Sequence, residues 1–363
     1  MDSRERTFLA LNFEEPDRVP IDLWISKGME KLIYSSLKYT KEEYFNHHDV
    51  DLRYIEGPKY IGPPLQKFSQ GIDEDIWGVQ RQAVTVPTKG GEETYKEVYI
   101  SPLSSAETVE EINVYNHWPS PDWFDYSCVE EQCVKIRNQG KVAVFMGDRL
   151  NRLAQLKPAM YIRGVEGILI DMSLNPEIAK AIFSNIRNFY CAYAERIFDA
   201  ANGKIDILLT GDDFGSQNGS LVSTEMWLDF LLDGFKKYID IAHSFNIKVM
   251  HHTCGSVRNI IPHMIDAGLD ILQSLQPEAL NMNPGELKSE FGNKLAFHGG
   301  ISIQKTLPFG TPNDIKCEVK NRLESFGKGG GYIISTAHNI QSDTPIENLE
   351  TLLNSYKDYG RYS

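Results

Sequence analysis

The residues best suited to chemistry lie in one short stretch, IKVMHHTCGS at residues 247–256. An apolar run typical of a buried strand leads there into two histidines and a cysteine, in a chain with nine histidines and five cysteines. In extended backbone the side chains of His252 and Cys254 point to one side and that of His251 to the other. A thiolate beside an imidazole favours zinc. A buried cysteine next to a hydrogen-bonded histidine is the alternative interpretation.

A catalytic zinc takes three protein ligands and leaves one position open, so a third ligand must come from elsewhere in the chain. His338, which follows the predicted strand at 331–334, is the first candidate, and His298 is the second. We therefore predict a metal site made of His252, Cys254 and His338.

Alternating strand-like and helix-like segments must position these side chains. The candidate strands lie near residues 22, 54, 144, 207, 249, 272, 296 and 333. Alternation at this spacing is typical of parallel βαβ units, and eight such strands predict an α/β fold, the closed (β/α)8 TIM barrel. A doubly wound open sheet would alternate too, but no GxGxxG turn follows the first strand.

One segment, from about residue 58 to residue 140, interrupts this alternation. Its middle, IWGVQRQAVTVPTKGGEETYKEVYISPL, predicts antiparallel strands joined by a turn at Gly90 and Gly91. We interpret it as an N-terminal antiparallel extension that packs on the barrel. Residues 1–363 are therefore predicted to form a single domain with an insert.

In such barrels the active site is built at the carboxyl ends of the strands. Polar residues follow six of the predicted strands at this end: Asp148, Asp212 with Asp213, His252 with Cys254, Gln276, His298 and His338. The predicted catalytic groups are Asp212, Asp213 and His298. The predicted substrate-binding residues are Asp148, Gln217 and Gln276.

Other roles remain open for some of these residues. One aspartate of an adjacent pair often caps a loop or the next helix, and His298 could make a structural hydrogen bond at the barrel rim. A metal-bound histidine usually needs an acceptor for its second ring nitrogen, which Asp212, Asp213 or Gln276 could supply.

Composition argues against several classes of protein. With 41% hydrophobic and 24% charged residues, the chain has an ordinary globular composition. A formal net charge of -13 argues against non-specific nucleic-acid binding, and the longest apolar runs are too short to cross a membrane. The opening MDSRERTFLALNFEEP has no apolar signal-peptide region, so we expect a cytoplasmic protein without disulfides.

Several long segments resemble one known family. The segments LAFHGGISIQKTLPFGTPNDI, GKGGGYIISTAHNIQSDTPIENLETLLNSYKDYG, HHTCGSVRNIIPHMIDAGLDIL and ERTFLALNFEEPDRVPIDLW are similar to the uroporphyrinogen decarboxylase superfamily. The resemblance covers most of the chain, is weakest in the insert, and implies a (β/α)8 barrel.

Two branches of this superfamily imply different chemistry. True uroporphyrinogen decarboxylases carry an arginine-rich MRQAGRY segment after the first strand, whereas the corresponding stretch here, IDLWISKGMEKL, has no arginine. In the corrinoid-dependent methyltransferases, an H-x-C segment and a cysteine after the last strand bind zinc. The segment His252-Thr253-Cys254 is similar to the first part of that pattern, and His338 stands at the position of the last cysteine.

The second branch therefore implies a zinc-dependent methyltransferase. It would move a methyl group between a methylated or methoxylated small molecule, or a thiol, and a corrinoid (cobalamin) carried by a partner protein. The resemblance also allows a homodimer. The alternatives are a decarboxylase-like enzyme that acts on a porphyrinogen or another carboxylate without an essential metal, and a barrel that binds a small ligand without turnover.

Overall fold

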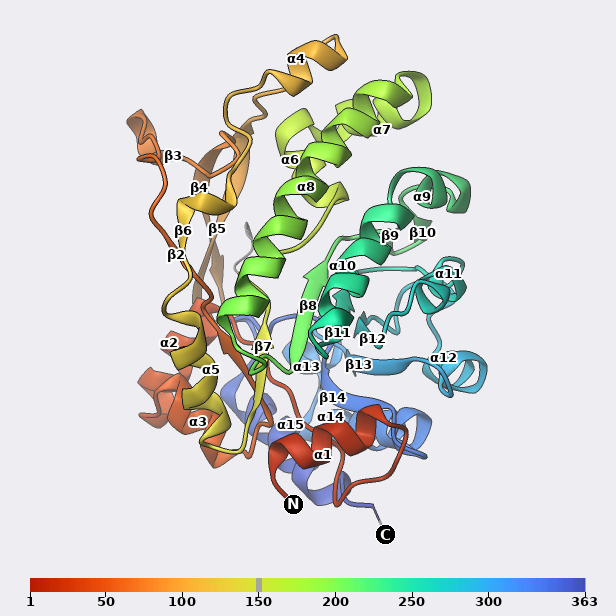
Figure 1. The fold of residues 1–363 in the computed structure, drawn as a ribbon. Coiled ribbons are helices and arrows are strands. Elements are labelled where there is room, and N and C mark those ends of the chain that lie inside the picture. Colours follow the sequence, from red (N-terminus) through yellow and green to blue (C-terminus); the bar gives the residue numbers. More distant parts are fainter. Residues whose placement is uncertain (148–151, 363) are drawn as a thin grey trace.

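The computed structural model describes residues 1–147 and 152–362, and its centre is a curled parallel sheet. In this part of the chain seven strands pair in the order β1-β7-β8-β11-β12-β13-β14, and each neighbouring pair is parallel. The strands are β1 (Leu52–Ile55), β7 (Val142–Phe145), β8 (Ile207–Gly211), β11 (Lys248–His252), β12 (Ile271–Leu275), β13 (Ala296–Ile301) and β14 (Tyr332–Thr336). The predicted α/β fold of the TIM-barrel type is confirmed (Figure 1).

The position of the eighth strand is filled by an irregular segment at residues 19–25. It lies between β14 and β1, because Asp22 N–H donates to Ile334 O at 3.0 Å and Asp51 N–H donates to Ile21 O at 2.8 Å. The strand predicted near residue 22 is reduced here to isolated bridges. Pro20 has no N–H to donate, and the N–H of Ile21 is taken by the Asp51 carboxylate, so a regular ladder cannot extend.

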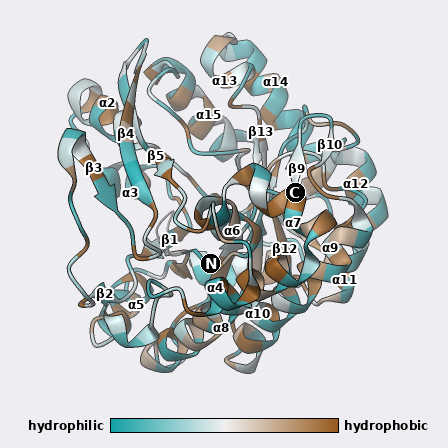
Figure 2. Cartoon of the chain, turned by 90° about the horizontal axis from the view of Figure 1, so that it is seen from above, coloured by the Kyte–Doolittle hydropathy of each residue, from teal (hydrophilic) through white to brown (hydrophobic). Residues whose placement is uncertain are grey.

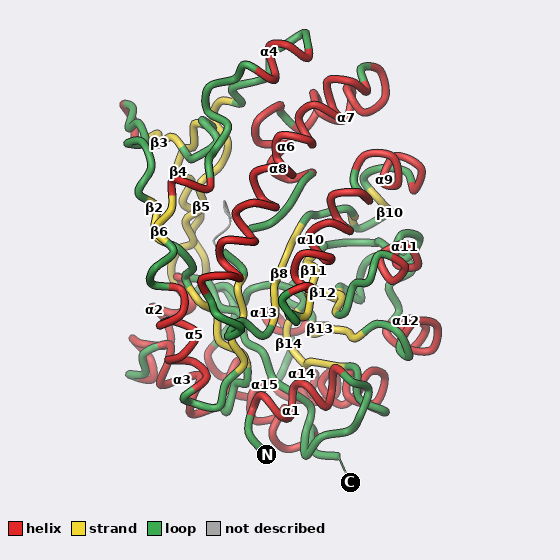
Figure 3. Tube along the Cα trace, in the orientation of Figure 1, coloured by secondary structure: helices red, strands yellow, loops and turns green. Residues whose placement is uncertain are grey.

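Helices connect the strands and cover the outside of the sheet (Figure 3). They are α1 (Ser3–Leu11), α2 (Lys27–Leu37), α3 (Lys41–His47), α4 (Val109–Asn113), α5 (Val129–Arg137), α6 (Leu156–Arg163), α7 (Val165–Leu174), α8 (Pro176–Ala200), α9 (Thr224–Phe230), α10 (Leu232–Ser244), α11 (Ile261–Asp266), α12 (Pro284–Phe291), α13 (Thr306–Phe309), α14 (Pro312–Arg322) and α15 (Ile346–Tyr359). Short helical turns lie at η1 (Ser69–Gly71), η2 (Pro121–Trp123) and η3 (Leu323–Gly327). Seen from above, the helices form an outer layer in which hydrophobic and hydrophilic residues alternate (Figure 2).

The long helix α8 shows why these segments become covering helices. Proline at its first position suits the helix start, because the missing N–H would have no partner there. Its buried residues include Ile178, Ile182, Ile186 and Phe189, at the three- and four-residue spacing that makes one apolar face. Among the described residues, no helix has the length and hydropathy that spanning a lipid bilayer requires.

Apolar side chains fill the inside of the barrel. Alternate residues of the strands form this cluster, for example Val142 and Val144 in β7 and Ile207 and Leu209 in β8. Leu11, the last residue of α1, belongs to the same cluster. Helix α1 therefore closes the amino-terminal end of the barrel, beside both chain termini (Figure 1).

The insert contains a long antiparallel hairpin, β4 (Gln80–Thr88) and β5 (Gly91–Ile100), with β3 (Ile72–Glu74) beside it. Thr88 pairs with Gly91, so Lys89 and Gly90 form the turn, one residue earlier than the sequence predicts. Two antiparallel pairs lie outside these sheets: β2 (Lys59–Tyr60) with β6 (Phe124–Asp125), and β9 (Gly215–Ser216) with β10 (Gly219–Ser220). Buried side chains of the insert, such as Trp77 and Val79, share one apolar core with the barrel helices.

Candidate metal centre

The three predicted metal ligands come together at the carboxyl end of the strands. His252 ends β11, Cys254 follows two residues later, and His338 lies two residues after β14. Their candidate ligand atoms, two imidazole nitrogens and one sulfur, lie within 4.8 Å of one another. Within residues 1–147 and 152–362, no other group of His, Cys, Asp and Glu side chains is placed to share a metal ion. These three residues are called the ligand cluster below.

The direction of His252 follows from the pleat of β11. Met250, two residues earlier, belongs to the apolar interior of the barrel, so His252 points inward as well. His251 faces outward, where its ring stacks on Phe214 at a centroid distance of 5.2 Å and its Nδ1 lies 2.8 Å from Thr210 Oγ1. The prediction that the adjacent histidines face opposite sides is confirmed.

A glutamine fixes the ring of His252. Nδ1 of His252 lies 2.8 Å from Oε1 of Gln273, in the neighbouring strand β12. An amide oxygen can only accept, so Nδ1 carries the hydrogen and Nε2 keeps its lone pair. Nε2 lies 3.5 Å from Sγ of Cys254. Gln273 therefore fills the acceptor position for which the sequence suggests an aspartate or Gln276.

Burial controls the protonation of the ligand cluster. It lowers the pKa of His252 well below the ordinary value, and the nearby Arg152 guanidinium lowers it further, so the ring is neutral at pH 7. Burial also lowers the pKa of His338. It raises the pKa of the Cys254 thiol to about 12, an effect that the Asp213 carboxylate strengthens. The imidazoles are thus ready to bind a metal, whereas the thiol must lose a proton as it binds.

Asp213 borders the ligand cluster. Its Oδ1 lies 3.7 Å from His252 Nε2 and accepts a hydrogen bond from Cys254 N–H at 3.2 Å. Its Oδ2 accepts from Lys157 Nζ at 2.5 Å. Burial alone would raise the pKa of Asp213, but the charged Lys157 and the Cys254 N–H hold it below its ordinary range. Asp213 is therefore an anion beside the cluster, able to interact with a positively charged group.

Asp212, the other half of the predicted acid–base pair, serves the fold. It is buried and accepts hydrogen bonds from the backbone N–H groups of Gln155, Leu156 and Lys157, at 2.6, 3.1 and 2.7 Å. Burial raises its pKa to about 6, although these three bonds favour the ionised form. The contacts occupy both carboxylate oxygens and cap the start of α6, so this aspartate takes the capping role that the sequence left open.

His298 belongs to a separate buried contact. Its Nε2 lies 2.8 Å from Asp22 Oδ2, which also accepts from the hydroxyl of Tyr54 at 2.5 Å. Both His298 and Asp22 are fully enclosed. Within the described residues His298 does not join the ligand cluster. Of the two candidates for the third ligand, the structure brings His338 to the other ligands.

A cavity of about 170 Å³ opens directly against the ligand cluster. Its lining contains both predicted substrate-binding glutamines and two members of the cluster: Gln217, Cys254, Gln276, Glu278, Ile303, Gln304, Ala337 and His338. Oε1 of Gln276 accepts from Gly255 N–H at 2.9 Å, which fixes its amide at the wall. The third predicted substrate-binding residue, Asp148, lies outside the described residues.

Two large side chains beside the ligand cluster, at the carboxyl end of the strands, were not predicted from the sequence. The ring of Trp24 stacks on His252 with centroids 5.7 Å apart and planes 29° apart. The guanidinium of Arg152 lies 5.7 Å from the centre of the Trp24 ring. Trp24 lies two residues from the centre of the strand predicted near residue 22 and was therefore identifiable, whereas Arg152 lies seven residues after β7 and gave no such signal.

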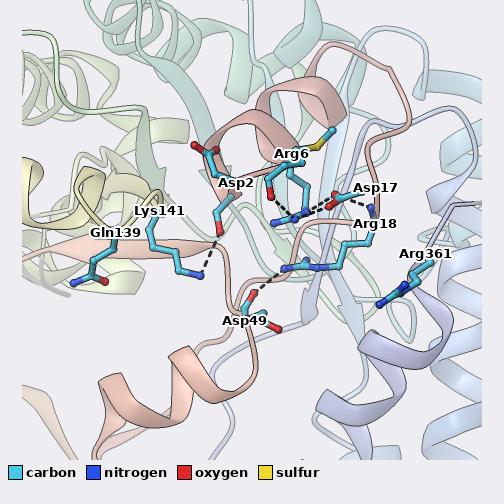
Figure 4. A pocket seen from close by; sticks show the side chains of 10 residues that line it. Asp2, Arg6, Asp17, Arg18, Asp49, Gln139, Lys141 and Arg361 are labelled. Carbon is cyan, nitrogen blue, oxygen red and sulfur yellow. Dashed lines mark hydrogen bonds and ion pairs between the residues drawn. The ribbon is translucent and has the colours of Figure 1, made fainter.

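A polar cavity of about 480 Å³ lies beside the amino-terminal segment, at the opposite end of the barrel. Figure 4 shows the side chains that line it. Arg6 and Arg18 line it, and both donate to the buried Asp51 at 2.7 Å. Asp17 lines it as well and pairs with Arg6 at 2.6 Å. The charged residues of this cavity thus hold the amino-terminal segment to the barrel. The cavity does not lie at the end of the barrel where active sites of this fold are found.

Comparison with known families agrees with this architecture. A model of the uroporphyrinogen decarboxylase (URO-D) family matches residues 154–359, so the chain belongs to this family. The matched region contains the whole ligand cluster and its cavity, and it leaves out the insert.

The individual relatives include both methyltransferases and uroporphyrinogen decarboxylases. The chain is 25% identical over 239 residues to a methylated-thiol–coenzyme M methyltransferase of Methanosarcina mazei, covering 62% of this chain and 60% of the relative. It is 25% identical over 194 residues to a uroporphyrinogen decarboxylase of Pelodictyon phaeoclathratiforme, covering 52% and 51%. The matched region thus spans less than two thirds of either relative. A solved methyltransferase from Methanosarcina mazei superposes over 99% of both chains with a TM-score of 0.66 at 18% identity, which shows a shared fold.

Proposed function

We propose that the protein is a zinc-dependent methyltransferase that moves a methyl group between a small methylated molecule and a corrinoid carried by a partner protein. The observation that carries this proposal is the ligand cluster, with its three donor atoms within 4.8 Å of one another beside a small cavity. Similarity to a methyltransferase that acts on a methylated thiol and coenzyme M supports the reaction type.

The ligand cluster fits zinc. A thiolate and two neutral imidazoles form a donor set that zinc favours, and three protein ligands would leave one coordination position open. Gln273 holds the His252 ring in the tautomer with a free Nε2. The residues that would hold the ion are therefore His252, Cys254 and His338.

A zinc ion at this position would act as a Lewis acid towards a sulfur or oxygen atom of the substrate. The surrounding residues supply binding and orientation. The glutamine amides of the cavity, Gln217, Gln276 and Gln304, offer hydrogen bonds to a small polar molecule. Asp213, fixed by Lys157, adds a negative charge beside the cluster. A volume of about 170 Å³ is smaller than a typical ligand pocket, so the buried part of the substrate must be small.

Metal analysis followed by a methyl-transfer assay tests the proposal. The purified protein is expected to contain close to one zinc per chain, and the zinc form should transfer a methyl group between cob(I)alamin or methylcobalamin and small thiols, methyl thioethers or methoxy compounds. Cobalamin serves as the probe because its absorption spectrum reports the state of the cobalt. Failure to retain zinc after reconstitution would contradict the proposal, and release of CO2 from uroporphyrinogen III would replace it with the decarboxylase alternative.

A further inference from the structure

The β4–β5 hairpin of the insert reaches the loop that carries His338. Thr88 Oγ1, at the end of β4, lies 2.8 Å from Ser342 Oγ, and Gln341 Nε2 donates to the Tyr95 hydroxyl at 2.7 Å. At the hairpin turn, a Cβ on Gly90 would collide with the carbonyl oxygen of Ser342. The hairpin and this loop are thus packed backbone against backbone.

Glu93 of β5 makes the central contact. Its side chain is buried, and its Oε1 accepts from the Ser26 hydroxyl at 2.5 Å and from Ser342 N–H at 2.9 Å. Within residues 1–147 and 152–362, Glu93 forms no ion pair. Burying a carboxylate without a cation is costly, so its hydrogen bonds must hold it in place. One oxygen atom therefore joins two loops that are far apart in sequence.

Both of these loops contribute to the candidate metal centre. They run parallel, because Ser26 N–H donates to Ile340 O at 2.9 Å and Ile340 N–H donates to Trp24 O at 2.8 Å. His338 lies two residues before Ile340, and Trp24 stacks on the His252 ring. A shift of either loop would move a group of the site relative to β11.

We infer that Glu93 is a positioning residue, which holds the loop of His338 against the Trp24 loop and so keeps the third ligand within reach of the other two. This inference rests on the proposed function, because it takes His338 as a zinc ligand. It assigns a role to the insert, which lies outside the matched family region.

Three single variants and a cobalt titration test the inference. Glu93→Ala removes the acceptor, Glu93→Gln keeps an oxygen that can accept from Ser26 and Ser342, and Glu92→Ala alters the exposed neighbour. Removing a group that orients a ligand typically lowers metal affinity 10- to 100-fold. We expect a loss of about that size for cobalt(II) in Glu93→Ala, recovery to within about three-fold of wild type in Glu93→Gln, and no loss in Glu92→Ala.

A double variant separates positioning from a general loss of structure. In a His338→Ala background, Glu93→Ala should cause no further loss of cobalt affinity, because the ligand through which it acts is already gone. An equal loss in both backgrounds, or unchanged affinity in the single variant, would overturn the inference.

Hydrogen exchange distinguishes a failure of the inference about Glu93 from a failure of the proposed function. In metal-free protein, Glu93→Ala should speed amide exchange at Ile340 and Ser342, and Glu92→Ala should not. Wild-type protein that binds no metal overturns the proposed function, and with it the role of Glu93 towards a ligand. Unchanged exchange in Glu93→Ala overturns the contact itself, whatever the metal result.

Discussion

The amide oxygen of Gln273 accepts the Nδ1 hydrogen of His252 at 2.8 Å, which joins β11 to β12 at the mouth of the barrel. This bond leaves Nε2 as the nitrogen that faces Cys254. Since both residues lie in neighbouring strands of one ladder, the sheet itself fixes the ring. The orientation of the candidate ligand is therefore set before any metal binds.

Changing Gln273 should weaken metal binding without removing a ligand. Gln273→Leu removes the acceptor, which frees the His252 ring to rotate and change tautomer, so we expect zinc affinity to fall about 10- to 100-fold. Gln273→Glu keeps an acceptor at this position and should lose less. Competition with a chromophoric chelator measures both values. Equal affinities for wild type and Gln273→Leu would show that the bond does not orient a ligand.

Cys254→Ala should abolish zinc retention and leave the fold intact. The thiol lies after the end of β11 and is partly exposed, so its loss should change the free energy of unfolding by only about 0.5 kcal/mol in metal-free protein. Cys317→Ala, at an exposed position in α14, is the matched control and should keep its zinc. Zinc content by elemental analysis and unfolding in urea measure the two effects. Full zinc content in Cys254→Ala would remove this residue from the site.

The sequence was sufficient to predict the strands and the directions of the side chains on them. Apolar runs identify the ladder strands, and a period of two residues predicts that His252, at the end of β11, and Cys254, just beyond it, face the same side. Both side chains lie in the ligand cluster. The strand near residue 22 was predicted to be regular, whereas residues 19–25 form an irregular segment. Its pairing depends on the carboxylate of Asp51, which lies 30 residues from Ile21 and which a local pattern does not reveal.

Residues that act across the barrel could not be predicted in the same way. Gln273 interrupts the apolar strand ILQSL, which marks it as unusual but does not show that His252 is its partner. Glu93 is one of several glutamates in a polar hairpin, and only the three-dimensional packing brings it to Ser342, 249 residues away. Contacts between distant segments depend on the way the sheet closes, which local patterns do not record.

Asp212→Ala should destabilise the protein. The substitution leaves two buried and one partly buried backbone N–H group at the start of α6 without their acceptor, each of which costs about 1 kcal/mol, so we expect a loss of about 3 kcal/mol in the free energy of unfolding. Asp212→Asn retains one acceptor oxygen and should lose less. Urea unfolding curves measure the difference. A variant with wild-type stability but no activity would instead make Asp212 a catalytic residue.

Acid should destabilise the fold through His251. Burial lowers the pKa of this histidine from 6.5 to about 3. Between these values the unfolded chain binds the proton and the folded chain does not, so stability is fully present above pH 6.5 and is lost as the pH falls. At pH 5.5 the loss from this residue is about 1 kcal/mol.

The variant His251→Gln tests this acid sensitivity because it removes the titrating group. It should be less stable than wild type at pH 7.5, because the packing of the His251 ring on Phe214 is lost. The decrease in unfolding free energy from pH 7.5 to pH 5.5, measured in metal-free protein, should be about 1 kcal/mol smaller in the variant than in wild type. Equal decreases in the two proteins would show that His251 is not the source of this acid sensitivity.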